Sequence, residues 1–263
     1  MNQSERIALI TGASSGIGEA CARRLARDGY GRILVARRRE QLEKLARELG
    51  NAEVIVADLT VPEDLARIEA RISNEPRLTL LVNNAGFGTK GVFWETPLEG
   101  QQRMYDLHVI ATMRLTRAAV AAMVPRNRGG VINVSSVAGF GQAPGNISYC
   151  ATKTWMNSFT EGLDLELRGR GSGVRVQALC PGFTYSEFHE VMGMSRDPIP
   201  KFMWLQTADV VDQSLRGLER GKVYVITGGF YRFIVALEKL TPRRLRSAAL
   251  VAAGRRRRKP AGK

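Results

Sequence analysis

The sequence predicts an α/β fold in which a parallel β-sheet carries helices on both faces. Short apolar runs alternate along the chain with segments of helical periodicity, a pattern typical of β-α-β units. The runs are rich in aliphatic and β-branched residues and lack polar alternation, as expected for strands buried on both faces. At 263 residues the chain suits one substantial core, so we expect a single doubly wound domain.

The elements follow in order from these patterns. Seven apolar runs predict strands at 7–10, 33–36, 54–57, 78–82, 131–134, 174–179 and 223–226. Helical periodicity predicts helices at 19–28, 39–49, 62–74, 101–124 and 148–168. Pro62 suits an early position in the third of these helices.

A glycine-rich turn, Thr-Gly-Ala-Ser-Ser-Gly-Ile-Gly at 11–18, joins the first predicted strand to the first helix. Glycines let the backbone approach a pyrophosphate, and the helix N-terminus offers free N–H groups and a favourable dipole. The glycine spacing differs from the commoner G-x-G-x-x-G pattern, and a glycine turn can also be simple punctuation. In this strand–turn–helix context we predict a dinucleotide-phosphate site.

Tyr149 and Lys153 lie four residues apart in a predicted helix and therefore share one face. A phenol has a pKa of about 10, too high for easy proton exchange at neutral pH. A cation within about 4–6 Å would lower that pKa and make the tyrosine a usable general acid/base. Ser136 could hold the oxygen of a reacting carbonyl or alcohol, with Ser135 as the competing choice.

The end of the second predicted strand bears on the choice between NAD and NADP. An acidic residue there would bond the ribose 2′-hydroxyl of NAD and repel a 2′-phosphate. Here the chain reads Val-Ala-Arg-Arg-Arg, with no acid before Glu40. Arginine offers phosphate a permanently charged, bidentate fork. We expect NADP(H), with Arg37 as the main phosphate contact and Arg38 as the second.

Five motifs carry a family resemblance: the turn at 11–18, Asn-Asn-Ala-Gly at 83–86, Ser136, Tyr149 with Lys153, and Pro-Gly-Phe-Thr at 181–184. With them the chain resembles the short-chain dehydrogenases/reductases over residues 5–228, in the bacterial branch near the ketoacyl and hydroxysteroid reductases. The resemblance implies a Rossmann-type domain with strand order 3-2-1-4-5-6-7 and NADP-dependent hydride transfer to a carbonyl. It also implies that Tyr149 donates the proton while Lys153 bonds the nicotinamide ribose.

By the same resemblance, Asp58 and Leu59 flank the adenine and Thr184 faces the nicotinamide carboxamide. Asp58 could instead cap a helix. The full expected cofactor site is Gly12, Ser14, Ser15, Gly16, Ile17, Gly18, Arg37, Arg38, Asp58, Leu59, Asn84, Ala85, Gly86, Tyr149, Lys153, Pro181, Gly182 and Thr184. The expected catalytic residues are Ser136, Tyr149, Lys153 and His108.

His108 departs from the family pattern, which usually has an asparagine at this place in the helix. That asparagine contributes to a water-linked proton relay behind the lysine. Histidine donates and accepts hydrogen bonds and titrates near neutrality, so His108 could maintain the relay. A packed structural histidine is the equal alternative. The departure also admits a scaffold or regulatory protein that binds NADP(H) without turnover.

Residues 184–207 correspond to the family's substrate lid. The segment is apolar and rich in methionine, which suits a lipophilic ketone or aldehyde, although about half of its apolar residues could pack on the core. Residues 229–253 mix apolar and basic residues, and Pro242 should divide them into two short helices. This extension could lie weakly on an anionic membrane, as in a lipid-handling protein, or cover its own domain or a second subunit. We favour packing.

Charge and composition exclude several classes. The net charge is +14, of which +6 falls in residues 254–263, a basic tail that we predict to be disordered. No groove-reading nucleic-acid module is recognisable, so we expect no nucleic-acid partner. Three cysteines without metal-ligand spacing, and a start without signal-peptide features, favour a cytoplasmic protein without a metal. The resemblance implies a homodimer or homotetramer that pairs the helices at 101–124 and 148–168.

Overall fold

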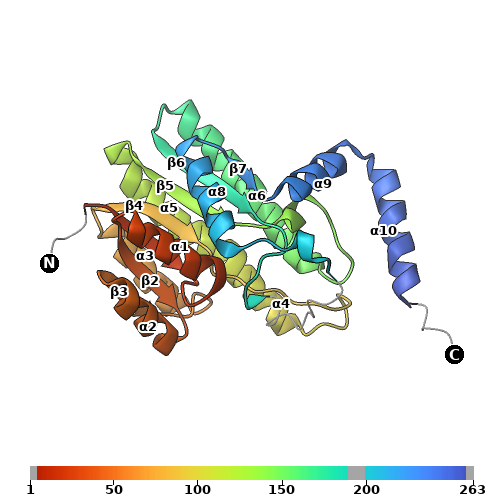
Figure 1. Cartoon of the computed structure of the whole chain (residues 1–263), viewed down its shortest axis with the longest axis horizontal. Helices are drawn as coiled ribbons and strands as arrows, with labels where there is room; N and C mark the ends of the chain where they lie inside the picture. The colour runs from red at the N-terminus through yellow and green to blue at the C-terminus, as the bar shows by residue number, and fades with distance from the viewer. Residues whose placement is uncertain (1–4, 189–198, 259–263) are drawn as a thin grey trace.

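The computed structural model describes residues 5–188 and 199–258, so the middle of the expected lid and the last five residues lie outside the described part (Figure 1). A seven-stranded parallel sheet has the order β3-β2-β1-β4-β5-β6-β7, which confirms the predicted fold class. The strands are β1 (Ile7–Thr11), β2 (Gly31–Ala36), β3 (Ala52–Val56), β4 (Leu78–Asn83), β5 (Gly129–Val134), β6 (Val174–Cys180) and β7 (Tyr224–Ile226). The strand order reverses between β1 and β4, and ligands of such sheets bind at this crevice.

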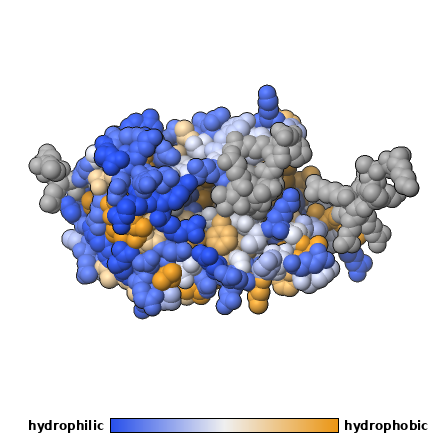
Figure 2. Space-filling model, turned by 90° about the horizontal axis from the view of Figure 1, so that it is seen from below, coloured by the Kyte–Doolittle hydropathy of each residue, from blue (hydrophilic) through white to orange (hydrophobic). Residues whose placement is uncertain are grey.

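Helices cover both faces of the sheet because alternate strand residues point to opposite sides. Leu9 of β1 packs in the cluster that includes α3 (Pro62–Ser73), α5 (Thr112–Met123) and α6 (Ile147–Gly169). Ile10 packs in the opposite cluster with α1 (Gly16–Arg27), α2 (Arg39–Leu49) and α8 (Thr207–Glu219). Helix α8 was not predicted, although its buried Val210, Val211 and Leu215 have helical spacing. The face seen in Figure 2 is mostly hydrophilic, with scattered hydrophobic patches.

The helix predicted at 101–124 is a composite. It begins as α4 (Leu98–Tyr105), passes through the π-helix η1 (Asp106–Ala111) and continues as α5. By length and composition alone the stretch Leu98–Arg126 could cross a membrane. Met104, Leu115 and Met123 are buried in the protein, however, which is the pattern of a core helix. π-helical turns are rare and often occur at functional sites, and this one contains His108.

The C-terminal extension forms two helices, as predicted, on either side of Pro242. Helix α9 (Gly229–Leu240) packs on the domain, whereas α10 (Arg243–Arg258) projects away from it (Figure 1). The extension was expected to cover its own domain or a second subunit; α9 packs on its own domain, and for α10 the expectation stays a prediction. Helix α10 continues to Arg258 and so overlaps the first residues of the tail at 254–263 that we predict to be disordered. Arginine and alanine are strong helix formers, and here their propensity outweighs the repulsion between like charges.

Candidate active site

A cavity of about 570 Å³ opens at the carboxyl ends of the strands. All but one of the predicted cofactor-binding residues line it: Gly12, Ser14, Ser15, Gly16, Ile17, Arg37, Arg38, Asp58, Leu59, Asn84, Ala85, Gly86, Tyr149, Lys153, Pro181, Gly182 and Thr184. Ser136 lines it as well. Gly18 and His108 are absent from the lining, and both lie behind it.

The glycine turn is shaped for close backbone approach. Gly12 and Gly16 have φ values of +64° and +60°, which other residues rarely adopt. Gly18 lies beneath the turn, where a Cβ atom would overlap the Gly12 carbonyl oxygen and lie 2.5 Å from the Asn84 amide nitrogen. Gly18 therefore lets α1 pack closely on β1. The free backbone at the start of α1 faces the cavity, and this fits a dinucleotide phosphate.

Asn84 has a role that the sequence did not reveal. Its side-chain amide donates to the carbonyl oxygens of Thr11 (2.9 Å) and Gly12 (3.1 Å). It therefore ties the end of β4 to the glycine turn. Asn83, at the end of β4, joins two neighbouring strands, because its amide donates to the Asn133 side-chain oxygen of β5 at 2.9 Å.

Ser136, Tyr149 and Lys153 converge in the cavity although they come from two elements. Ser136 follows β5; its hydroxyl accepts from the Ala138 backbone N–H at 3.1 Å and lies close enough to the Tyr149 phenol to affect the pKa of that group. Tyr149 and Lys153 share the inward face of α6, with the Lys153 ammonium 5.8 Å from the centre of the phenol ring. The same ammonium donates to the carbonyl oxygen of Val134 at 2.7 Å. The competing Ser135 instead donates to the Lys153 carbonyl oxygen at 3.1 Å and holds α6 against β5.

The predicted pKa shift of the tyrosine is wrong for this structure. Burial raises the pKa of Tyr149 to about 12, and the hydrogen bond from Ser136 only partly offsets this. Burial also lowers the pKa of Lys153 to about 7. The expected lowering of the phenol's pKa by the ammonium does not prevail, because loss of water penalises both charged forms and Lys153 is bonded to Val134.

His108 is fully buried, and both of its ring nitrogens are engaged. Nε2 accepts from the Phe87 backbone N–H at 3.3 Å, so Nδ1 carries the proton and donates to the Thr152 hydroxyl at 2.9 Å. Thr152 in turn donates to the Tyr149 carbonyl oxygen at 2.9 Å. Burial, with a smaller contribution from the Lys153 charge, holds the pKa of His108 well below its usual 6.5. The imidazole is neutral and joins the loop after β4 to α6.

The arginines after β2 occupy different positions. Arg38 lies over the glycine turn, where its guanidinium donates to the Ser14 hydroxyl at 3.1 Å and pairs with Glu187 at 2.8 Å. Arg37 is more exposed, and its only ion pair among the described residues is a 3.8 Å contact with Asp58. Both line the cavity at the end of β2, Arg38 beside Ser14 and Arg37 beside Asp58.

Asp58 already has partners for both carboxylate oxygens. Oδ1 accepts from the Thr60 backbone N–H at 3.0 Å and from the Thr60 hydroxyl at 2.8 Å. Oδ2 pairs with Arg103 at 3.2 Å. Burial would raise the pKa of Asp58, but these hydrogen bonds and the nearby Arg37 and Arg103 lower it overall. The carboxylate therefore stabilises the turn after β3, which is close to the capping alternative left open by the sequence.

Tyr231 is one of the lining residues that the sequence reasoning did not assign to the site. It comes from α9, and its hydroxyl accepts from the Phe183 N–H at 3.0 Å and donates to the Met203 carbonyl oxygen at 2.6 Å. Its ring occupies the space beside Gly182, where any Cβ atom would overlap it. The only signal in the sequence was an aromatic residue in the apolar pattern just after the last strand.

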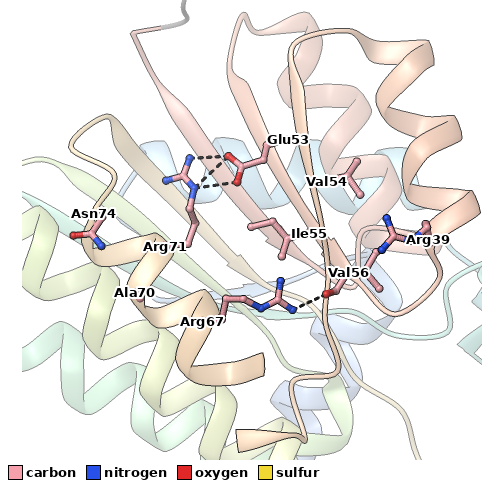
Figure 3. Close-up of a pocket in the computed structure, with 9 residues that line it drawn as sticks. All are labelled: Arg39, Glu53, Val54, Ile55, Val56, Arg67, Ala70, Arg71 and Asn74. Atoms are coloured by element: carbon pink, nitrogen blue, oxygen red, sulfur yellow. Dashed lines mark hydrogen bonds and ion pairs between the residues drawn. The ribbon is translucent and has the colours of Figure 1, made fainter. Parts of the chain in front are cut away.

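A second hollow lies along the edge of β3. Two of its arginines, Arg67 and Arg71, are bonded to other residues of the same hollow. Figure 3 shows Arg71 directed at Glu53 and Arg67 at the carbonyl oxygen of Val56. The Arg71–Glu53 contact is 2.7 Å and the Arg67–Val56 bond is 2.8 Å. None of the predicted site residues lines this hollow.

Comparison with known proteins identifies the family of the chain. The sequence pattern of the short chain dehydrogenase family matches residues 6–195. The chain belongs to this family. An uncharacterised oxidoreductase from Myxococcus xanthus is 37% identical over 227 residues, covering 84% of this chain and 87% of the relative. As a member of this family, the chain is an oxidoreductase with the Rossmann-type fold described above.

Solved structures of family members superimpose over almost the whole chain. A short-chain dehydrogenase from Sphingobium yanoikuyae, in complex with NADPH, is 32% identical and covers 98% of both chains with a TM-score of 0.80. A bulky-bulky ketone specific alcohol dehydrogenase from Comamonas testosteroni is 30% identical, with a TM-score of 0.75 over 98% of this chain and 96% of its own.

Proposed function

We propose that this short-chain dehydrogenase uses NADPH to reduce a lipophilic ketone or aldehyde, and that it can run the reaction in reverse. The observation that carries the proposal is the convergence of Ser136, Tyr149 and Lys153 in the same cavity as the glycine turn. When bound, NADPH supplies the hydride. The Ser136 and Tyr149 hydroxyls donate hydrogen bonds to the substrate carbonyl oxygen, and Tyr149 delivers the proton to it.

Lys153 prepares Tyr149 for this role. Its ammonium favours the phenolate that remains after proton transfer, because the two groups face each other in a site with little water. With a pKa of about 7, Lys153 is only partly charged at neutral pH in the ligand-free protein. Hydrogen bonds from the Lys153 ammonium to a bound ribose would favour its charged form, so cofactor binding would strengthen the acid–base pair.

The charge at the end of β2 supports NADPH over NADH. Family membership alone does not decide between the two, but Arg37 and Arg38 both line the cavity at the end of β2 and no carboxylate follows β2 directly. The ion pair of Arg37 with Asp58 is long and exposed, so its guanidinium can turn to a 2′-phosphate at little cost. Arg38 already points across the glycine turn and is the more fixed of the two.

Aromatic walls support a lipophilic substrate. Phe87, Phe183, Phe188 and Tyr231 line the cavity, and the Phe188 and Tyr149 rings are 5.8 Å apart. Such surfaces bind apolar groups and leave the carbonyl as the polar end, next to Ser136 and Tyr149.

Exposed apolar residues support a homodimer or homotetramer. Met113 of α5 and Leu165 of α6 are 40% and 57% exposed, on the helices that the family resemblance pairs across subunits. Burial of such residues between copies is favourable. Light scattering that finds only a monomer at micromolar concentration contradicts this assembly. The cytoplasmic location expected from the sequence stays a prediction.

Loss of NADPH absorbance with a panel of bulky ketones, aldehydes and ketoacyl thioesters tests the function. We expect turnover that falls by roughly 100-fold or more in Tyr149→Phe, since the general acid is gone while the ring stays. NADPH binding, measured by fluorescence, should persist in that variant, and Arg37→Ala should lose preference for NADPH over NADH by at least about tenfold. Tyr149→Phe with full activity, or an NADPH-binding protein that turns over nothing on the panel, contradicts the proposal.

A further inference from the structure

Helix α9 is apolar on two opposite sides. Its inner side carries Tyr231 and Val235, which are buried against the domain. Its outer side carries Phe230, Phe233, Leu237 and Leu240, spaced at three- and four-residue intervals that place them on one face. A helix that only covered a domain would have a polar outer side. We call these four residues the outer face of α9.

The outer face is strongly exposed. Phe233, Leu237 and Leu240 are 67%, 55% and 82% exposed, and Phe230 is 39% exposed. Phe202 of the 3-10 turn Lys201–Met203 extends the surface, since it is 69% exposed and meets the Phe230 ring edge-on at 5.3 Å. Single exposed apolar residues are ordinary, but a continuous row of large ones marks an interaction surface.

Positive charge surrounds this row. Residues 229–258 contain nine basic residues and a single acidic one, Glu238. Arg243 and Arg244 are exposed and follow the outer face directly, at the start of α10. The last turn of α10 adds four consecutive arginines, and the helix stands clear of the domain (Figure 1).

We propose that the outer face of α9, together with α10, docks on an anionic lipid bilayer. Apolar side chains enter the interface of the bilayer while arginines pair with acidic headgroups, the combination used by interfacial helices. The charge disfavours a second copy on this surface, because two such extensions would bring their arginines together. An acidic soluble partner would satisfy the arginines but would not explain the row of exposed phenylalanines and leucines.

The docking helix is also a wall of the active-site cavity. Tyr231, on the inner side of α9, lines the cavity. Its hydroxyl accepts a hydrogen bond from the Phe183 N–H and donates one to the Met203 carbonyl oxygen. Docking therefore places the cavity beside the lipid, where an apolar substrate is concentrated. This consequence for substrate supply rests on the proposed reductase function, whereas docking itself does not.

Vesicle co-sedimentation of the full chain tests the docking. We expect binding to an equimolar mixture of phosphatidylcholine and phosphatidylglycerol and about tenfold weaker binding, or none, to phosphatidylcholine alone. Phe233→Glu and Leu237→Glu should each weaken binding by about tenfold or more, since each removes an inserted apolar side chain. Arg243→Gln with Arg244→Gln should weaken it by roughly tenfold or more and reduce its salt sensitivity.

Matched controls place the change elsewhere. Leu98→Glu alters a leucine that is 73% exposed on α4, and Arg170→Gln alters an exposed arginine at the end of α6. Both should bind vesicles like the unchanged protein. Circular dichroism establishes that each variant is folded.

Three results overturn the proposal. One is equal binding to neutral and anionic vesicles, and another is loss of binding in the controls as large as in the α9 variants. The third is absence of vesicle binding with light scattering that shows an oligomer dissociated by Leu237→Glu, which assigns the face to a second copy. Because vesicle binding needs no turnover, a failed docking test leaves the NADPH assay unaffected.

Discussion

The two turns that frame the cavity are held in different ways. The glycine turn at 11–18 is fixed by backbone packing, with Gly18 pressed against the Gly12 carbonyl and Asn84 bonded to the carbonyl oxygens of the turn. The turn at 181–184 also has backbone bonds, to Val137 and Leu205, but the space beside its Gly182 is filled by one side chain, the Tyr231 ring, from a helix much later in the chain. A glycine that lies against backbone, as Gly18 does, can be replaced only by displacing the chain, whereas a glycine that lies against a side chain, as Gly182 does, depends on one distant residue.

The largest loss of stability should come from a substitution of Gly18 in the glycine turn at 11–18. Gly18→Ala places a methyl group on the Gly12 carbonyl oxygen, which cannot move without displacing β1, so we expect a loss of roughly 3–5 kcal/mol in unfolding free energy. Urea unfolding measures it. Gly162→Ala is the control, because Gly162 lies within α6 with nothing near its Cβ position, and alanine there should stabilise by about 1 kcal/mol. Equal effects of the two substitutions would contradict the packing argument.

The buried ammonium of Lys153, on α6, should give the next largest effect on stability. The ordinary pKa of 10.5 for Lys153 falls to about 7 on folding, so the unfolded chain holds an extra proton between these pH values. Stability from this group therefore rises with pH between about 7 and 10.5, and the full cost of burying the charge is felt below pH 7. Lys153→Met should raise the unfolding temperature of the cofactor-free protein by about 5 °C at pH 6.

The pH dependence separates this effect from simple repacking. The gain in Lys153→Met should shrink steadily as pH rises from 7 towards 10, as thermal unfolding at several pH values can measure. Lys153→Arg serves as the control, because arginine stays charged throughout and should destabilise at every pH. A gain in Lys153→Met that is the same at pH 6 and pH 9.5 would show that the lysine's pKa is not lowered.

A substitution of Gly182 in the turn at 181–184 should lower the stability less, and a second substitution at Tyr231 should partly restore it. Gly182→Ala makes a methyl group overlap the Tyr231 ring, and we expect a loss of roughly 2 kcal/mol in unfolding free energy. In the double variant with Tyr231→Ala the clash is gone. The loss of unfolding free energy in the double variant should therefore be smaller, by about 1 kcal/mol or more, than the sum of the losses in the two single variants. Asn84→Ala should give no such rescue to Gly18→Ala. Additive losses at Gly182 and Tyr231 would remove the contrast between the turns.

Substitution of His108, which connects the loop after β4 to α6, should have the smallest effect, and that effect should be on kcat. Its neutral ring links the loop after β4 to α6, so His108→Asn should lower kcat by less than about tenfold through misplacement of Tyr149. Because the pKa of His108 lies well below 6.5, the ring does not titrate near neutrality and the pH–rate profile should keep its shape. A shifted acid limb in His108→Asn would assign the ring to the proton relay.

Much of the nucleotide half could be predicted from the sequence. Glycines at 12, 16 and 18 record the backbone constraint in their own identity, and the apolar runs record burial on both faces of the sheet. Tyr149 and Lys153 were also predictable as a pair, because helical spacing fixes which residues share a face. Local geometry determines all of these features.

Only the tertiary structure decided the remainder. The pKa directions of Tyr149 and Lys153 depend on how much water the assembled cavity excludes, and His108 and Asn84 depend on which loops meet them. Tyr231 became part of the site because α9 folds back over Gly182, a contact between residues 49 positions apart. Short-range spacing was enough to predict the family, the sheet and the shared helix face of Tyr149 and Lys153, since each depends only on neighbouring residues. Burial, partner choice and the exposure of α9 are long-range properties that arise only when distant segments pack together.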